Sequence, residues 1–140
     1  MSLINLLPQK IEEDFRSNSI LKVISGLDNF DVQSVKIIVE AASLGGADLV
    51  DIACKPELVD LALKNSTLPV CVSSVVPNSF LDSVKAGASL IEIGNYDTFY
   101  EKGINFSDEK VLNITKETRD LLPNVPLSCL LYTSPSPRDA

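Results

Sequence analysis

The chain has 140 residues, of which 45% are hydrophobic and 22% charged, so it is long enough for one soluble globular domain with a core. Its net charge of −7, with no Lys/Arg cluster to offset it, argues against nucleic acid and anionic membranes as partners. No apolar run approaches the roughly 20 residues of a membrane-spanning helix. The chain has no histidine, and its three cysteines lack CxxC spacing. We therefore expect no metal site, and the cofactor stays open.

The N-terminal segment predicts a helix over residues 3–17, whose acidic residues 12–14 argue against a signal or transit peptide. Short apolar runs and helical patterns then alternate, which is typical of βα units in a parallel sheet. The predicted strands are residues 21–25, 49–53, 70–74, 90–94 and a shortened 125–128, and the predicted helices are residues 31–44, 56–64, 77–86 and 107–122. Ser107 as an N-cap, and Pro56 and Pro77 in first turns, support the helix starts.

An internal repeat indicates how these units are arranged. Residues 46–53 (GADLVDIA) and 87–94 (GASLIEIG) are near copies that begin 41 residues apart, about two βα units. We therefore predict an α/β fold, the N-terminal half of a (β/α)8 TIM barrel with about four βα units, the start of a fifth strand and an extra N-terminal helix. A doubly wound open sheet is the alternative, although no G-x-G-x-x-G follows the first strand.

The last residues of the chain differ from the rest. From Cys129 the sequence is CLLYTSPSPRDA, whose two prolines cannot continue a central strand. Its first eleven residues resemble the in-frame translation of a transposase-type sequencing adapter. We therefore expect residues 1–128 to be a truncated barrel domain and residues 129–140 a non-native tail, with a native Ser/Pro-rich linker as the alternative.

Several motifs in fixed order resemble a known family. They are LKVISGLDNF (21–30), VDIA (50–53), CVSS (71–74), IEIGNYD (91–97) and FYEKG (99–103). Together they are similar to the hypothetical chloroplast frame 23 family of cyanobacteria and red-lineage plastids, whose members look like phosphate-binding or aldolase-type barrels. The resemblance implies the fold, and a cyanobacterial cytoplasm or plastid stroma, but not the reaction. It also implies that a phosphate site would lie after strands seven and eight, outside this chain.

Two acidic residues are the candidate catalytic groups. Side chains alternate along a strand, so Asp51 shares a face with residues 49 and 53, and the repeat places Glu92 at the matching position. Both carboxylates are expected to point into the barrel near its C-terminal rim, where burial could raise their pKa values for acid–base work. The structural interpretation is that a Lys or Arg from the missing half neutralises each of them. Both interpretations stay open.

Other polar residues follow the predicted strands. Ser25, Asn29, Ser73 and Asn95 are the candidate substrate-binding residues, although Asn29 lies in a sequence that also favours a turn, and the loop of residues 95–106 has a packed-surface alternative to a lid. Lys22 could suggest a Schiff-base lysine. Its phase with Val50 and Ile91 instead predicts that it faces the helices.

The function that these residues support is a barrel enzyme, a lyase or isomerase, acting on a small phosphorylated metabolite by carboxylate acid–base chemistry. The alternative is a non-catalytic ligand-binding or regulatory barrel. The expected partners are accordingly a small-molecule ligand and a second copy of the chain in a homo-oligomer.

Overall fold

The computed structural model describes residues 4–94 and 96–130, in which strands and helices alternate. The chain begins with a 3-10 turn η1 (Ile4–Leu6) and helix α1 (Gln9–Arg16). The strands are β1 (Lys22–Ile24), β2 (Leu49–Ala53), β3 (Val70–Ser74), β4 (Leu90–Ile93) and β5 (Leu127–Cys129). The helices that follow them are α2 (Val32–Leu44), α3 (Pro56–Asn65), η2 with α4 (Pro77–Ser79, Phe80–Lys85), α5 (Asp97–Glu101) and α6 (Asp108–Leu121). No helix in the described ranges is long and apolar enough to cross a membrane.

The five strands form one parallel sheet in the order β1-β2-β3-β4-β5. This sequential order argues against the doubly wound alternative, in which the strand order reverses at a switch point. It is consistent with half of a (β/α)8 barrel preceded by a helix, so the predicted α/β class is confirmed. The boundary at Ser128 stays a prediction, since β5 continues through Cys129 and the tail from residue 131 lies outside the described residues.

The helix boundaries follow from local chemistry. The Asp31 side chain caps α2 by accepting from the Ser34 amide at 2.6 Å, and Ser107 caps α6 by accepting from the Lys110 amide, as predicted. Gly45 ends α2, and Gly46, with φ of 78°, turns the chain toward β2. The sequence did not predict α5, which occupies part of the loop of residues 95–106.

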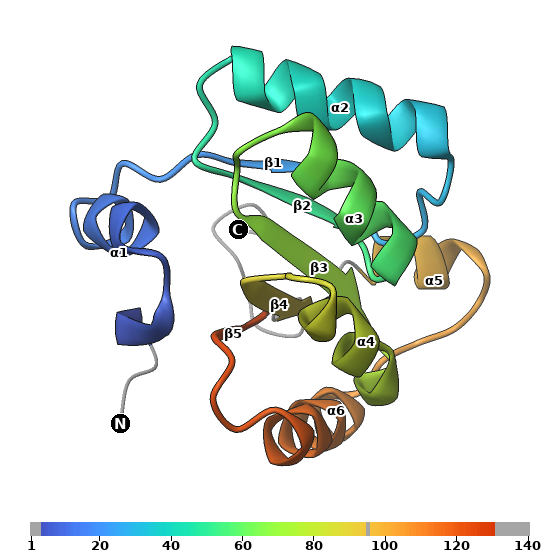
Figure 1. Cartoon of the computed structure of the whole chain (residues 1–140). Helices are drawn as coiled ribbons and strands as arrows, with labels where there is room; N and C mark the ends of the chain where they lie inside the picture. The colour runs from blue at the N-terminus through green and yellow to red at the C-terminus, as the bar shows by residue number, and fades with distance from the viewer. Residues whose placement is uncertain (1–3, 95, 131–140) are drawn as a thin grey trace, which may run out of the picture.

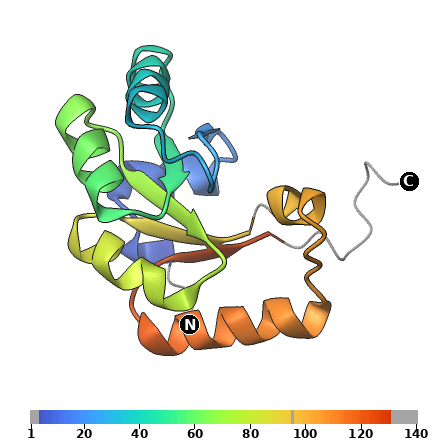
Figure 2. The same ribbon diagram turned by 90° about the vertical axis from the view of Figure 1, so that its right-hand side faces the viewer.

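The two faces of the sheet are covered differently. Figures 1 and 2 show α2, α3, α4 and α6 arranged around one side, which we call the outer face, and α1 lying apart from them. The outer face holds the main core. On the other side, the inner face, Ile11 of α1 packs with Leu49, Cys71 and Leu90.

The inner face differs from the sequence prediction in its apolar residues. From the sequence alone, the alternation of side chains along the strands predicts that Val23, Val70 and Val72 face inward, together with Leu21, Leu49 and Leu90. The three valines instead pack into the outer core, because the register aligns Asp51 with Cys71 and makes Cys71 the inward residue of β3. The chain therefore buries more of its own apolar surface than the sequence predicted.

Candidate functional site

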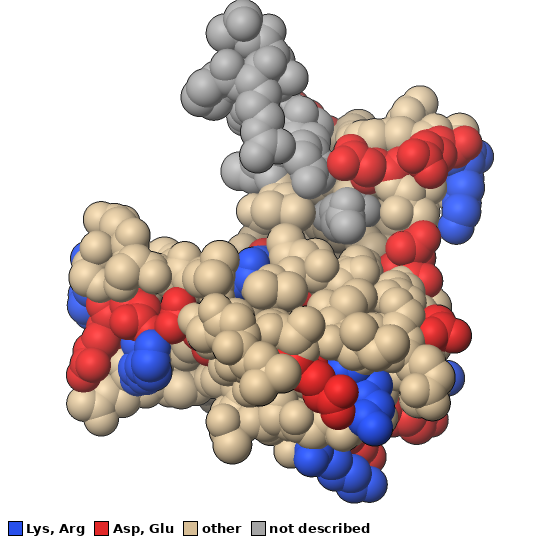
Figure 3. Space-filling model, turned by 90° about the horizontal axis from the view of Figure 1, so that it is seen from above, with Lys and Arg blue, Asp and Glu red and all other residues tan. Residues whose placement is uncertain are grey.

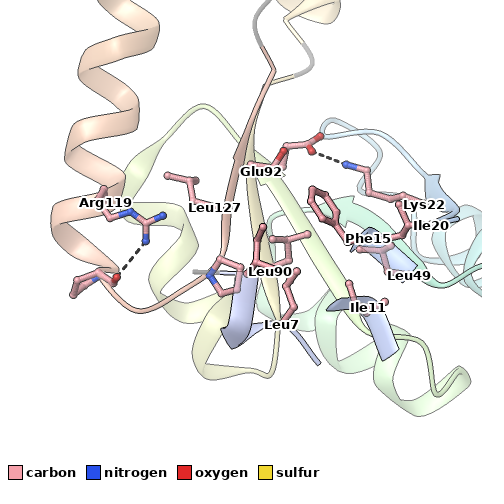
Figure 4. A pocket seen from close by; sticks show the side chains of 14 residues that line it. Leu7, Ile11, Phe15, Ile20, Lys22, Leu49, Leu90, Glu92, Arg119 and Leu127 are labelled. Atoms are coloured by element: carbon pink, nitrogen blue, oxygen red, sulfur yellow. Dashed lines mark hydrogen bonds and ion pairs between the residues drawn. The ribbon is translucent and has the colours of Figure 1, made fainter. Parts of the chain in front are cut away.

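Two carboxylates and one ammonium group meet on the inner face. Asp51 lies in the middle of β2 and Glu92 near the end of β4, and both point to the same side, as the repeat predicted. Lys22 Nζ lies 3.0 Å from Asp51 Oδ2 and 2.6 Å from Glu92 Oε2. Figure 4 shows the Lys22–Glu92 pair at the wall of a cavity. The three side chains form what we call the Lys22 cluster.

The prediction for Lys22 was wrong. The pairing of β1 with β2 aligns Lys22 with Leu49 rather than Val50, so the lysine shares the inner face with Asp51. Because the side-chain period of a strand is two, a one-residue error in phase moves a side chain to the opposite face. The cation that pairs with the two carboxylates thus comes from this chain.

Burial controls the electrostatics of the Lys22 cluster. Asp51 is 1% and Glu92 4% exposed. Burial raises the pKa of Asp51 above its ordinary value, and this effect outweighs the opposing charge of Lys22 and the hydrogen bond from Ser73. For Lys22, burial alone would lower the pKa, but the charge of Asp51 and the hydrogen bond to Glu92 raise it, so the amine stays protonated. It cannot act as a neutral amine nucleophile in this state.

The candidate binding residues divide into separate groups. Ser73 joins the Lys22 cluster, because its hydroxyl donates to Asp51 Oδ1 at 2.6 Å. Ser25 and Asn29 bond to each other instead, since Asn29 Nδ2 donates to the hydroxyls of Ser25 at 2.9 Å and Ser34 at 3.0 Å. They therefore order the turn into α2. Asn95 lies outside the described residues.

Aromatic contacts hold the loop after β4 in place. Tyr96 is 1% exposed, and its ring centroid lies 4.9 Å from that of Phe106. Phe99 contacts the same ring at 5.3 Å, and Lys110 Nζ lies 4.4 Å from its centroid. These contacts favour the packed-loop interpretation for this part of the chain.

A cavity of about 580 Å³ lies between α1 and the inner face. Its wall is mostly apolar, and Lys22 and Glu92 provide polar groups to it, whereas Asp51 is not among its lining residues. Arg119 also lines the cavity (Figure 4), but its guanidinium donates to the carbonyls of Leu122 and Val125 at 3.2 and 2.9 Å. Three of the lining residues are charged: Lys22, Glu92 and Arg119. Arg119 is bonded to backbone carbonyls, whereas Lys22 and Glu92 pair with each other at the cavity wall.

A charge argument could have identified Lys22 from the sequence. Two inward carboxylates need a counter-charge, because an unpaired buried charge is costly. Lys22 is the only Lys or Arg in any of the five strands. The need for charge balance was thus a better guide than the hydrophobic phase of a three-residue strand.

The fold and the Lys22 cluster define a class: a sequentially ordered parallel α/β sheet, consistent with half of a barrel, with a buried lysine–carboxylate group on its inner face. The chain belongs to the family described as "Protein of unknown function (DUF561)", whose model matches residues 6–133.

Several curated proteins that share one printed name are similar to this chain. The chain is 49% identical over 122 residues to "Uncharacterized protein ycf23" of Cyanophora paradoxa, a match that covers 85% of this chain and 49% of the relative. It is 40% identical over 120 residues to the protein of the same name from Antithamnion sp., with 86% and 43% covered. The one from Pyropia yezoensis is 36% identical over 121 residues, with 86% and 44% covered.

These matches confirm the resemblance stated above. The relatives are plastid-encoded, in line with the expected plastid or cyanobacterial setting. The chain spans about half the length of the curated relatives it matches.

Proposed function

We propose that the Lys22 cluster is the acid–base centre of a barrel-type lyase or isomerase that acts on a small phosphorylated metabolite. The observation that carries this proposal is that two buried inner-face carboxylates share one ammonium group. Burial raises the pKa of Asp51, so this carboxyl takes up a proton more readily than an exposed one. Groups of this kind are candidates for functional sites.

The positions of the side chains suggest separate roles. Glu92 lines the cavity, so it is the carboxylate that can take a proton from a bound ligand or return one. Lys22 lies beside it and can stabilise negative charge that develops on the ligand. Asp51 lies behind Lys22, where its contacts at 3.0 Å to the ammonium and 2.6 Å to Ser73 make it a positioning residue.

The phosphorylated nature of the substrate rests on the family resemblance rather than on this chain. Phosphate sites of barrels lie after strands seven and eight. The cation that lines the cavity besides Lys22, Arg119, is bonded to backbone carbonyls. A phosphate would thus be held by residues beyond the five strands described here.

A second function, ligand binding without catalysis, is favoured by one observation. Among the described residues, no buried side-chain N or O atom lacks a hydrogen-bond partner. A cluster whose polar atoms are already satisfied is explained as a structural element that orders the inner face, as buried ion pairs do in some proteins. The apolar cavity beside it could then bind a ligand without catalysis.

Proton exchange in D2O separates the two functions. The chain, alone and together with the half of the Cyanophora paradoxa relative that it does not cover, is incubated with phosphorylated aldehydes, ketones and keto acids. NMR then records deuterium incorporation next to the carbonyl group. We expect incorporation for one of these classes, and a loss of about 10²-fold or more in Glu92→Gln.

The matched control is Asp28→Asn, which changes an exposed carboxylate away from the cluster and should leave the exchange unchanged. Ligand-dependent thermal stabilisation without exchange, in samples shown to be folded, would overturn the enzyme in favour of the binding protein.

A further inference from the structure

Within the residues that the structure describes, strand β1 forms one edge of the sheet. It pairs with β2 on one side and is the first strand in the sheet order. The Ser25 amide donates to the Asp51 carbonyl at 2.8 Å, and alternate amides of a strand point to opposite sides. The Ile24 amide therefore points away from β2, toward the open edge. An edge of this kind is a template for another strand.

An apolar groove of about 390 Å³ lies beside this edge, between β1 and α2. Its lining includes Leu21, Ile24 and Ala41, of which Leu21 is 51% and Ile24 53% exposed. Figure 3 views the molecule from the side of α2 and shows stretches of uncharged surface between groups of charged side chains. The neighbouring surface of α2 adds Ile37, 63% exposed. A strand at the edge and a helix on this surface would cover both.

The charge on the inner face indicates which kind of segment docks at the β1 edge and the groove. Of the described residues, Lys22 alone forms ion pairs with Asp51 and Glu92, so the cluster has one negative charge in excess when both carboxylates are ionised. A second copy of this chain would bring the same excess charge. A segment that carries a Lys or Arg would neutralise it.

We propose that the β1 edge and the α2 groove dock a strand–helix segment from the half of the relatives that this chain does not cover, and that this segment places a Lys or Arg side chain beside Glu92 on the inner face. The relatives are long enough to supply it, because the chain covers 43–49% of their length. The inference does not depend on the proposed catalysis, since an ion pair forms whether or not a reaction follows.

The test is reconstitution from two pieces. The chain is co-expressed with the uncovered half of the Cyanophora paradoxa relative, and the mass and affinity of any complex are measured by analytical ultracentrifugation. We expect a 1:1 complex. Ala41→Glu, a change at an exposed position in the groove, should weaken it at least tenfold. Leu63→Glu, at a 43% exposed position on α3, is the matched control and should bind like the parent chain.

The charge is tested separately with Glu92→Gln, which leaves the groove intact. We expect this variant to bind the second half at least tenfold more weakly and with a smaller dependence on salt. Equal binding by the parent chain and Glu92→Gln would overturn the ion pair. A homodimer that Ala41→Glu disrupts, formed without affinity for the second half, would overturn the whole proposal, and so would equal effects of Ala41→Glu and Leu63→Glu. Circular dichroism is recorded for each variant, and only variants with the spectrum of the parent chain are compared.

Discussion

Removal of the Lys22 charge is the most direct test of the cluster. In Lys22→Met, Asp51 and Glu92 stay buried, at 1% and 4% exposure, without their counter-ion. Breaking a buried pair by removing one partner costs about 3–5 kcal/mol. Because the Lys22 side chain is 23% exposed, we expect the low end of that range, about 3 kcal/mol. With a urea m-value of about 2 kcal/mol/M, the unfolding midpoint falls by about 1.5 M.

The measurement is urea unfolding followed by far-UV circular dichroism. Lys36→Met is the matched control, because Lys36 pairs with Glu40 at 3.8 Å and both side chains are more than 40% exposed. Such a surface pair contributes about 0–1 kcal/mol, so the control midpoint should move little. Adding Glu92→Gln to Lys22→Met should recover part of the loss, since it removes an unpaired charge. Equal midpoints for Lys22→Met and Lys36→Met would refute the buried cluster.

Three further predictions follow from single contacts. The Asp51 carboxyl should titrate above its ordinary pKa of about 3.9 in carboxyl NMR. The folded state then binds more protons between the two pKa values, so the free energy of unfolding should fall as pH rises through that window, a slope absent from Asp51→Asn. Ser73→Ala removes the donor to Asp51 Oδ1 and should raise this pKa further; an unchanged titration would show that the bond is unimportant. Gly94→Ala should lower the thermal midpoint more than Gly103→Ala. Both glycines have positive φ, but a Cβ at residue 94 would lie 2.7 Å from Leu130 Cβ, whereas a Cβ at residue 103 would have no neighbour within 4 Å. Equal shifts of the midpoint would contradict this packing.

The layout of the sheet could be predicted from the sequence because each strand carries its own signal. Residues 49–53 and 70–74 are short, mostly apolar runs with the length and flanking turns of buried parallel strands, and their predicted bounds match β2 and β3. The near repeat of residues 46–53 and 87–94 then placed Asp51 and Glu92 on one face. That part of the candidate site depended only on the period of two.

The phase of β1 and β3 could not be settled in the same way. A run such as Val70-Cys71-Val72 is buried on both faces, so hydrophobicity does not tell which side is which. Only the register with β2 decides, and register is a property of paired strands. For α5, the stabilising contacts are the aromatic packing of Tyr96 and Phe106, which five helical residues cannot predict.

The inner face changes in character along the strands, and this change links the fold to the proposed site. In three neighbouring strands an inward apolar residue is followed two positions later by an inward polar one: Leu49 and Asp51, Cys71 and Ser73, Leu90 and Glu92. The apolar members pack with Ile11 of α1, so this helix covers the end of the sheet where the strands begin. Ser73 and Glu92 lie toward the carboxyl ends of β3 and β4, the side on which barrel enzymes bind their substrates, whereas Asp51 lies in the middle of β2, level with Cys71. A buried ion cluster is often no more stabilising than apolar residues of similar volume. Stability alone therefore gives no reason for a charged group on this face, and the position of Glu92 near the carboxyl end of β4 supports the role toward a ligand that we propose for it.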